Sequence, residues 1–264
     1  MNTIKQHQYT IREIQNIFRM DEKVKSRQTI FNAEQRGEIP TAKRIIRGKV
    51  NARSWSSNQL PGIGRRFGFL SPNTPIGPEI ISVFTQKGGT LKSTLTYSLA
   101  RGFALNNKKV LIIGLDSQAS VTMTTLGQRS SPESLQEYRK QREQWGGLYH
   151  LIYQDSVQMS DVVHPTSLPT LDIIPEVGEL AELERRLQGA DGREKIFQKK
   201  LLPLIKGYDI VIFDNGPSWN QLVRNSLVAA TTVISPIGCD LGTYEVLDIN
   251  MQSVTEFRDA LDLK

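Results

Sequence analysis

Short apolar runs separated by amphipathic stretches fill the chain from residue 79 onward. The runs are rich in β-branched and aliphatic residues, and they cover residues 80–84, 110–115, 171–175, 210–214 and 232–236. Runs of this length and composition predict strands that are buried on both faces. Residues 93–106, between the first two runs, have helical spacing. We therefore expect an α/β fold with a mostly parallel sheet covered by helices.

The segment 1–70 follows a different, helical pattern. Thr10 and Glu13 have capping-box spacing, and apolar residues recur at helical intervals over residues 11–18. A second helix is predicted over about residues 23–35, and it ends before Gly37. Two short helices joined by a tight turn are a helix-turn-helix candidate, and the basic loops that follow are a candidate wing.

A tract rich in proline and glycine, residues 71–78, separates the two patterns and is the predicted linker. We therefore expect a small domain over residues 1–70 and a larger one over residues 79–264. The segment 1–77 holds 14 Lys and Arg against 5 Asp and Glu, although the whole chain has a net charge of only +6. This asymmetry favours a basic module that contacts a polyanion.

The DNA-contact candidates are the basic and polar residues of the second helix and of the stretch beyond it. They are Arg27, Gln28, Arg36, Arg44, Arg47, Arg53, Arg65 and Arg66. Most of them would contact phosphate, which gives affinity and salt dependence without reading the base sequence. The alternative is a solvated dimerisation arm, because a charged face is usually only solvated.

The composition excludes several classes of protein. A single cysteine, Cys239, excludes a disulfide framework and a cluster-binding redox site within one chain. No run approaches the roughly 18 apolar residues of a membrane span, and the polar N-terminal segment lacks the apolar centre of a secretion signal. We expect a cytoplasmic protein.

The strongest chemical signal is a glycine-containing loop between the first apolar run and the helix that follows. It reads Lys87-Gly88-Gly89-Thr90-Leu91-Lys92-Ser93-Thr94. A strand that turns through glycines into a helix directs backbone N–H groups and the positive end of the helix dipole at one point, which suits phosphate. Lys92 would then reach the β- and γ-phosphates, and the Ser93 hydroxyl would bind magnesium. The alternative is an ordinary glycine-rich turn followed by a lysine.

Two aspartates fall at the ends of later apolar runs. Asp116 follows the run 110–115, and Asp214 closes the run 210–214. Ligands of such sheets bind at the carboxyl ends of the strands, where a carboxylate can hold a divalent metal or accept a proton from water. The alternative for each residue is a helix cap.

These segments resemble the deviant Walker A, second box and Walker B motifs of the ParA/MinD family of ATPases. The similar segments are residues 86–94, 115–120 and 208–218, in the family's order and spacing. The resemblance implies a P-loop NTPase fold with ATP or ADP and Mg²⁺ as ligands. It further implies that Lys87 reaches the phosphates of a partner subunit, that Asp116 positions the attacking water, and that Asp214 holds magnesium through water.

The family's role implies an ATP-dependent partition protein for plasmids or chromosomes. An ATP-bound homodimer would bind DNA nonspecifically, and a ParB-like centromere-binding protein would stimulate an otherwise weak ATPase. The protein would be cytoplasmic and associated with the nucleoid. The segment 1–70 resembles the winged helix-turn-helix of larger ParA proteins, so repression of its own operon is a candidate second role.

The chain departs from the family pattern in three ways. Leu91 occupies a position where glycine is usual, often with a positive φ that disfavours a β-carbon. Gly114 replaces a common first aspartate of the second box. Family members usually continue for about a hundred residues beyond the equivalent of Lys264, so we expect a body that is incomplete at its C-terminal end.

Two alternative functions stay open at this point. One is a transcriptional regulator whose ATPase body acts only as a nucleotide sensor. The other is a MinD-like positioning ATPase, which should end in a basic amphipathic helix that binds the membrane. Residues 244–264 hold five acidic and two basic residues, which disfavours contact with anionic lipid.

Overall fold

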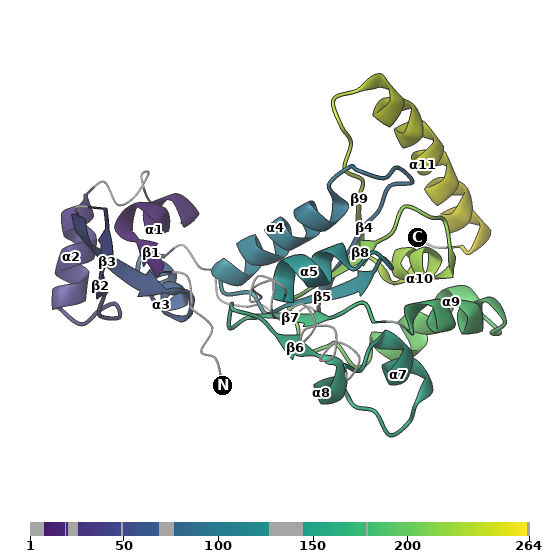
Figure 1. The fold of residues 1–264 in the computed structure, drawn as a ribbon, viewed down its shortest axis with the longest axis horizontal. Helices are drawn as coiled ribbons and strands as arrows, with labels where there is room; N and C mark the ends of the chain where they lie inside the picture. The colour runs from purple at the N-terminus through teal and green to yellow at the C-terminus, as the bar shows by residue number, and fades with distance from the viewer. Residues whose placement is uncertain are drawn as a thin grey trace.

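The computed structural model describes residues 8–18, 20, 26–48, 50–68, 77–126, 145–177 and 179–262. Figure 1 shows two parts: a small module formed by the residues before the predicted linker, and a larger body that begins after it. Most of the predicted linker and the first residues of the predicted second helix lie outside the described residues.

The module combines helices with a three-stranded antiparallel sheet in the order β1-β3-β2. Its elements are β1 (Gln8–Thr10), α1 (Ile11–Ile17), α2 (Arg27–Gln35), β2 (Lys43–Arg47), β3 (Val50–Ser56), the 3₁₀ turn η2 (Ser57–Gln59) and α3 (Leu60–Arg66). The predicted capping box is present, since the Glu13 carboxylate accepts hydrogen bonds from the Thr10 backbone N–H and hydroxyl at 2.7 and 2.8 Å. Gly37, with a φ of 69°, follows α2 as predicted.

The basic stretch after the second helix, predicted as loops and a candidate wing, has strands and a further helix in the structure. It forms a strand hairpin, β2 and β3, which is the form that a wing takes, and a third helix, α3, which was not predicted. Two glycines and a proline in α3 hide its helical pattern in the sequence. Helix α3 forms because Leu60 and Ile63 are fully buried in the same cluster as Trp55. Packing here outweighs local propensity.

The body contains a six-stranded sheet in the order β6-β7-β5-β8-β4-β9. Its strands are β4 (Glu79–Val83), β5 (Val110–Leu115), β6 (His164–Pro165), β7 (Leu171–Ile174), β8 (Ile210–Asn215) and β9 (Thr232–Ile234). All neighbours pair in parallel except β6, a short edge strand antiparallel to β7. The five predicted strands are therefore confirmed, and β6 was not predicted.

Helices cover both faces of this sheet, as predicted. The helical elements of the body are α4 (Lys92–Leu105), α5 (Ser120–Leu126), α7 (Leu148–Tyr153), α8 (Met159–Val162), α9 (Leu180–Gln188), η5 (Arg193–Lys195), η6 (Phe197–Leu201), α10 (Gln221–Ala229) and α11 (Leu241–Ala260). Alternate residues of β5 join different clusters: Ile112 packs with residues of α4 and α5, and Ile113 packs with residues of α7, α9 and α10. This alternation gives a three-layer α/β architecture.

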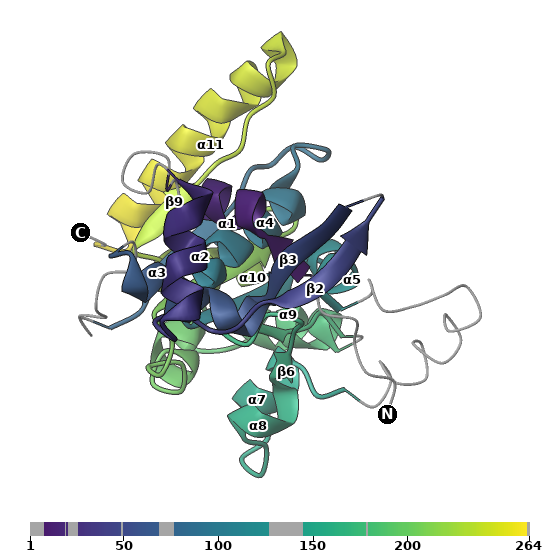
Figure 2. The ribbon, with the colours of Figure 1, turned by 90° about the vertical axis from the view of Figure 1, so that its left-hand side faces the viewer.

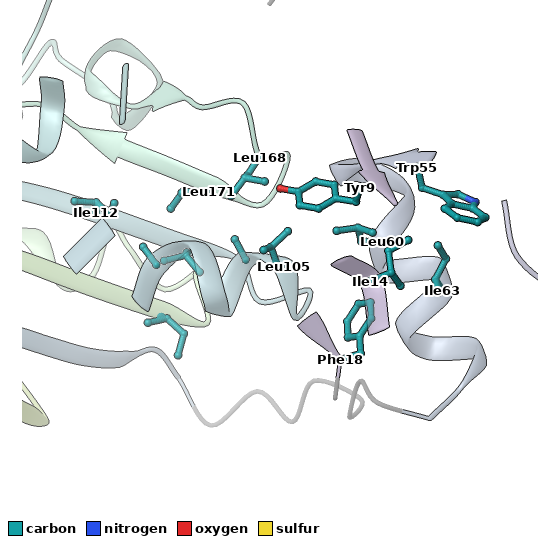
Figure 3. Packing of buried hydrophobic residues seen from close by; sticks show 14 of the residues in the cluster. Tyr9, Ile14, Phe18, Trp55, Leu60, Ile63, Leu105, Ile112, Leu168 and Leu171 are labelled. Atoms are coloured by element: carbon teal, nitrogen blue, oxygen red, sulfur yellow. The ribbon is translucent and has the colours of Figure 1, made fainter. Parts of the chain in front are cut away.

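The module packs against one end of α4 and the segment before β7. Figure 3 shows Tyr9 and Leu60 of the module beside Leu105 and Leu168 of the body, and all four belong to one buried cluster. The Tyr9 hydroxyl accepts a hydrogen bond of 3.1 Å from Arg101 of α4. The two parts therefore share apolar contacts as well as a polar tie.

Helix α11 extends from the sheet edge that β9 forms (Figures 1 and 2). It is anchored through Val254 and Phe257, which pack on a small cluster containing Phe84, and Phe257 contacts the Trp219 ring. Leu241 at its start is 74% exposed. Within the described ranges, none of the helices combines the length and apolar character that crossing a bilayer requires.

Candidate functional site

The loop between β4 and α4 carries the candidate phosphate-binding residues. Strand β4 ends at Val83 and α4 begins at Lys92, so the loop joins a buried parallel strand to a helix. Backbone φ is positive at Gly89 (73°) and at Leu91 (61°). The first N–H groups of α4 and the positive end of its dipole face this loop, and both favour an anion there.

Leu91 has the left-handed backbone that its position in the motif leads one to expect. Its φ and ψ are 61° and 27°, a region that costs a residue with a β-carbon about 1–2 kcal/mol. Its side chain is 68% exposed, so the strain lies in the backbone and not in packing. The loop keeps a glycine-like path at an energetic cost.

Lys92 is a buried cation at the first position of α4. The residue is 7% exposed, and its amine donates a hydrogen bond of 2.9 Å to the backbone carbonyl of Lys87. Burial lowers the pKa of this amine, and the charges of Asp116 and Asp214 oppose the shift. The amine is thus held inside the loop, beside both candidate carboxylates.

Asp214 lies fully buried near the end of β8. Its Oδ1 accepts a hydrogen bond of 2.9 Å from the Thr96 hydroxyl, while Oδ2 is buried and has no hydrogen-bond partner among the described residues. Burial raises the pKa of this carboxyl to about 6, and the nearby Ser93 hydroxyl and the Thr96 hydroxyl oppose the shift. A buried oxygen without a donor beside a serine hydroxyl is a hard-ligand set that fits a divalent cation.

Asp116 follows β5 at the same edge of the sheet. Its Oδ1 accepts a hydrogen bond of 3.0 Å from the Gln118 N–H, and a β-carbon on Gly216 would lie 3.5 Å from its carboxyl carbon. It lines a cavity of about 340 Å³ together with Pro217 and Ser218 beyond β8 and residues of α9. Asp116 therefore borders open space, unlike the buried Asp214.

The Lys87 side chain contacts a residue outside the set of candidates. Its amine forms an ion pair of 3.0 Å with Asp240, just before α11, and both side chains are partly exposed. Of the candidate residues, the structure therefore brings together Lys92, Ser93 and Asp214, with Asp116 close by.

Several polar residues that no sequence motif marks also hold the site in place. Asn250 of α11 is buried, accepts a hydrogen bond of 3.1 Å from the Gln86 N–H and donates one of 2.7 Å to the Thr85 hydroxyl. Asn215 donates hydrogen bonds of 3.0 Å to Ser82 and to the Val83 carbonyl, and so ties β8 to β4. No local signal identifies Asn250, because both of its partners lie at the opposite end of the body's sequence.

A carboxyl group from another part of the chain occupies the space of the aspartate side chain that is usual at position 114. Glu176, two residues after β7, is 1% exposed, and a β-carbon on Gly114 would fall inside its carboxyl group. Burial raises the pKa of this carboxyl to about 8, and the charges of Asp214 and Asp116 add to the shift while a hydrogen bond from Thr122 opposes it. The carboxyl ends of β5, β7 and β8 thus each contribute an acid.

Among the candidate DNA contacts, Arg53 is held inside the module. Its guanidinium is 3.0 Å from the Glu34 carboxylate and 4.1 Å from the centroid of the Phe31 ring. Glu34 also accepts a hydrogen bond of 2.8 Å from the Ala42 N–H. These contacts join α2 to β3, so Arg53 serves the fold of the module.

Three other arginines among the candidates face acidic residues at the surface. Arg47 is 3.2 Å from Glu13, Arg66 is 2.6 Å from Glu38, and Arg36 is 4.0 Å from Glu38. Exposed pairs of this kind contribute only about 0–1 kcal/mol, so the carboxylates hold these three arginines weakly.

The remaining candidates have different surroundings. Arg27, Gln28 and Arg44 are exposed on α2 and β2, elements at the end of the module that faces away from the body (Figures 1 and 2). Arg65 instead lines a cavity of about 220 Å³ between the module and the body, which Leu105 also borders. Arg65 is therefore placed at the internal boundary.

Comparison with known proteins identifies relatives of the body. A family described as an AAA domain matches residues 78–263. The chromosome partitioning protein ParA of Myxococcus xanthus is 31% identical over 169 residues, 64% of this chain and 55% of that protein. Protein SopA of Escherichia coli K12 is 26% identical over 238 residues, 83% of this chain and 57% of its own length. The chain thus spans somewhat more than half the length of these relatives.

Solved structures share the fold of the body. Cobyrinic acid a,c-diamide synthase from Mycobacterium smegmatis, with bound ADP and magnesium, gives a TM-score of 0.58 at 25% identity and covers 69% of each chain. A plasmid partition protein from Borrelia burgdorferi bound to AMPPNP gives 0.57 at 25% identity, covering 71% of this chain and 73% of the other. Both similarities confirm the α/β fold with a mostly parallel sheet.

Proposed function

Because the chain belongs to the AAA domain family, we propose that it is an ATPase that segregates DNA. The observation that carries the proposal is the meeting of Lys92, Asp116 and Asp214 at the carboxyl ends of three adjacent strands. The fold alone does not identify the function, since one of the similar solved structures is a cobyrinic acid a,c-diamide synthase. The names of the partition relatives favour DNA segregation.

ATP and ADP are the proposed ligands of residues 87–94. The N–H groups of the loop and of α4 would bind the phosphates, and the Lys92 amine would exchange its carbonyl partner for a phosphate oxygen. Ser93 and Asp214 would hold Mg²⁺, which supplies charge neutralisation when bound. The oxygen of Asp214 that lacks a hydrogen-bond donor among the described residues supports this assignment.

Asp116 and Lys87 have separate proposed roles. Asp116 borders open space and would orient the attacking water by accepting its proton. Lys87 would leave Asp240 and bind the phosphates of a partner subunit, so that ATP joins two chains as a homodimer. Because the Lys87 ion pair is partly exposed, its loss is a small cost.

The module is the proposed contact with DNA, and Arg27, Gln28 and Arg44 are its first candidates. They are exposed on the outer elements α2 and β2. The alignment with SopA covers 83% of the chain, more than residues 78–264 alone would supply, so it extends into the module. This extent supports a module shared with a partition protein, and a winged helix-turn-helix remains the proposed type.

The cellular setting is part of the same proposal. A centromere-binding partner of the ParB kind would stimulate hydrolysis, and the ATP-bound dimer would be cytoplasmic and associated with the nucleoid. Action as a repressor of its own operon would use the same module. The relatives named for chromosome and plasmid partition support this setting.

Light scattering after size exclusion, with ATP hydrolysis measured in parallel, tests the ATPase and the dimer. We expect a dimer with ATP and Mg²⁺ and a monomer with ADP, and slow hydrolysis that double-stranded DNA accelerates. Asp116→Ala should keep the dimer and abolish hydrolysis, whereas Lys87→Ala should prevent the dimer. Lys206→Ala, an exposed lysine elsewhere on the body, is the matched control. Normal hydrolysis by Lys87→Ala would refute the role of Lys87 in the partner's site.

The salt dependence of DNA binding tests the module. Arg44→Ala and Arg27→Ala should each weaken binding to unrelated sequences equally and reduce the slope of log K against log salt by about one. The control is Arg185→Ala, whose side chain is 70% exposed on the body. Equal losses in all three variants would show that the module is not the binding surface. A strong preference for one duplex would indicate the operator-binding role.

A further inference from the structure

A buried carboxyl group that the proposed mechanism does not use lies over strand β5. Gly114 pairs in register with Asp214, and their neighbours Ile112 and Ile212 belong to the cluster on the α4 and α5 face. Alternation along the strands therefore directs positions 114 and 214 to that same face. Glu176 places its carboxyl group in the space that a side chain at 114 would take.

This carboxyl group is tied to helix α5 in both directions. The Thr122 hydroxyl donates a hydrogen bond to Glu176 Oε2, and the Glu176 backbone N–H donates one of 3.1 Å to the same hydroxyl oxygen. Both residues are buried, at 0% and 1% exposure. The pair therefore fixes the start of α5 against the end of β7.

The start of α5 is continuous with the segment that bears Asp116. The Ala119 N–H donates a hydrogen bond of 2.9 Å to the Asp116 carbonyl, and Ala119 has a positive φ of 54°. Helix α5 begins at the next residue, Ser120. A tight turn with a left-handed residue has little freedom, so a shift of α5 would move Asp116.

Burying the Glu176 carboxyl group costs free energy, which suggests that the group has a function. An apolar side chain would fill the space without the penalty of burying an ionisable group. The group lies near Asp116 and Asp214, and burial raises its pKa to about 8, so it is mainly neutral at pH 7. A neutral acid can both donate and accept hydrogen bonds without adding a third negative charge near a phosphate.

We propose that Glu176 is a positioning residue for Asp116, and that Gly114 leaves room for its carboxyl group. The acid that β5 lacks at position 114 is supplied from the end of β7, and it holds the segment from Asp116 to Thr122 through α5. This inference rests on the proposed ATPase activity for its effect on turnover, but not for its effect on the local backbone.

Two measurements on the full chain test the proposal. Glu176→Ala should lower kcat for ATP about tenfold, the scale of a small misplacement of a catalytic group, with the Kd for ATP within about twofold. Hydrogen exchange of the amides at 117–122 should rise, while those of α10 should not. Glu176→Gln, which keeps the shape and a neutral acceptor, should restore both. Thr122→Val should resemble Glu176→Ala, and Thr125→Val on the same helix is its control.

Relocating the acid gives the sharpest test. Gly114→Asp alone should be strongly impaired, because its β-carbon would overlap the Glu176 carboxyl group. Gly114→Asp combined with Glu176→Ala should recover slow exchange at 117–122 and a kcat above that of Glu176→Ala. Wild-type kcat and exchange in Glu176→Ala would refute the proposal, as would a double variant no better than either single one. Absence of ATP hydrolysis in the wild type would refute the ATPase instead, and the exchange data would still decide the role of Glu176.

Discussion

The module and the body use positive charge in opposite ways. In the module, arginines are numerous, but Arg47, Arg53 and Arg66 face Glu13, Glu34 and Glu38. In the body, Lys92 is buried, and its amine donates to a carbonyl beside two carboxylates. The net charge of a segment therefore overstates its free cationic surface, whereas one buried cation in a loop indicates a specific anion site.

The largest expected effect is a loss of stability in the module that leaves the body folded. Trp55 is fully buried in the module and donates a hydrogen bond of 2.7 Å to the Pro40 carbonyl. Trp55→Ala should reduce the free energy of unfolding of the module by about 3–5 kcal/mol. Hydrogen exchange should locate the loss in residues 8–68, and ADP affinity should stay within about twofold.

The surface change Arg44→Ala is the control for this comparison, and it should alter stability by less than about 0.5 kcal/mol. If Trp55→Ala also abolished ADP binding, the module and body would fold as one unit. The shared cluster around Tyr9 and Leu105 would then be the cause.

The next effect concerns the buried cation of the body. Lys92→Ala should weaken binding of ADP and of ATP about 100-fold or more, because a positioned charge in a water-poor site is lost. Isothermal calorimetry with Mg²⁺ measures the change, and Lys206→Ala should bind normally. A loss below about threefold would mean that the phosphates bind elsewhere.

A smaller effect is the pH dependence that Glu176 imposes on the body. Its pKa rises from 4.5 to about 8 on folding, so the folded chain binds more protons than the unfolded chain between these pH values. The stability that this group contributes is therefore greatest below pH 4.5 and falls by about 1.4 kcal/mol per pH unit as pH rises through the window. Glu176→Gln should lose this dependence, whereas the raised pKa of Asp214 affects the wild type and the variant alike.

Urea unfolding of the wild type and Glu176→Gln at pH 5.5, 6.5 and 7.5 measures the difference. The variant should gain in relative stability at each step, and parallel curves would contradict the raised pKa.

The smallest effect tests backbone strain in the loop. Leu91→Gly should stabilise the body by about 1 kcal/mol, because glycine adopts the left-handed region without a steric penalty. Ser98→Gly, exposed in the interior of α4, should instead destabilise it by about 0.5–1 kcal/mol. Thermal unfolding should show opposite signs, and equal shifts would contradict strain at Leu91.

The sequence predicted the sheet well because each strand carries its own signal. The run Val110–Leu115 is wholly apolar, and β5 has the same bounds. A parallel strand that is buried on both faces is a continuous apolar run, so it can be predicted without knowing which strands it pairs with. Helix α3 was missed because its stability comes from contacts of Leu60 and Ile63 with distant residues. A local sequence pattern predicts which residues are buried, but it does not predict which distant residues they pack against.

The candidate site divides in the same way. Lys92, Ser93 and Asp214 were predicted together because loops and strand ends converge at one edge of a parallel sheet. Asp240, Glu176 and Asn250 were not predicted, since each meets the site through a contact between segments far apart in the sequence. Gly114 was the one local indication of this arrangement. It showed that the usual aspartate side chain is absent, but it did not show that the Glu176 carboxyl group takes that space.

The length of helix α4 is constrained because both of its ends make specific contacts. Its first residue, Lys92, directly follows the loop, and Arg101 near its other end donates a hydrogen bond to Tyr9 of the module. Deleting one residue between them would rotate Arg101 by about 100° about the helix axis and draw it about 1.5 Å toward the loop. Substitutions along the exposed side of α4 should be tolerated, whereas single-residue insertions and deletions should uncouple the two ends.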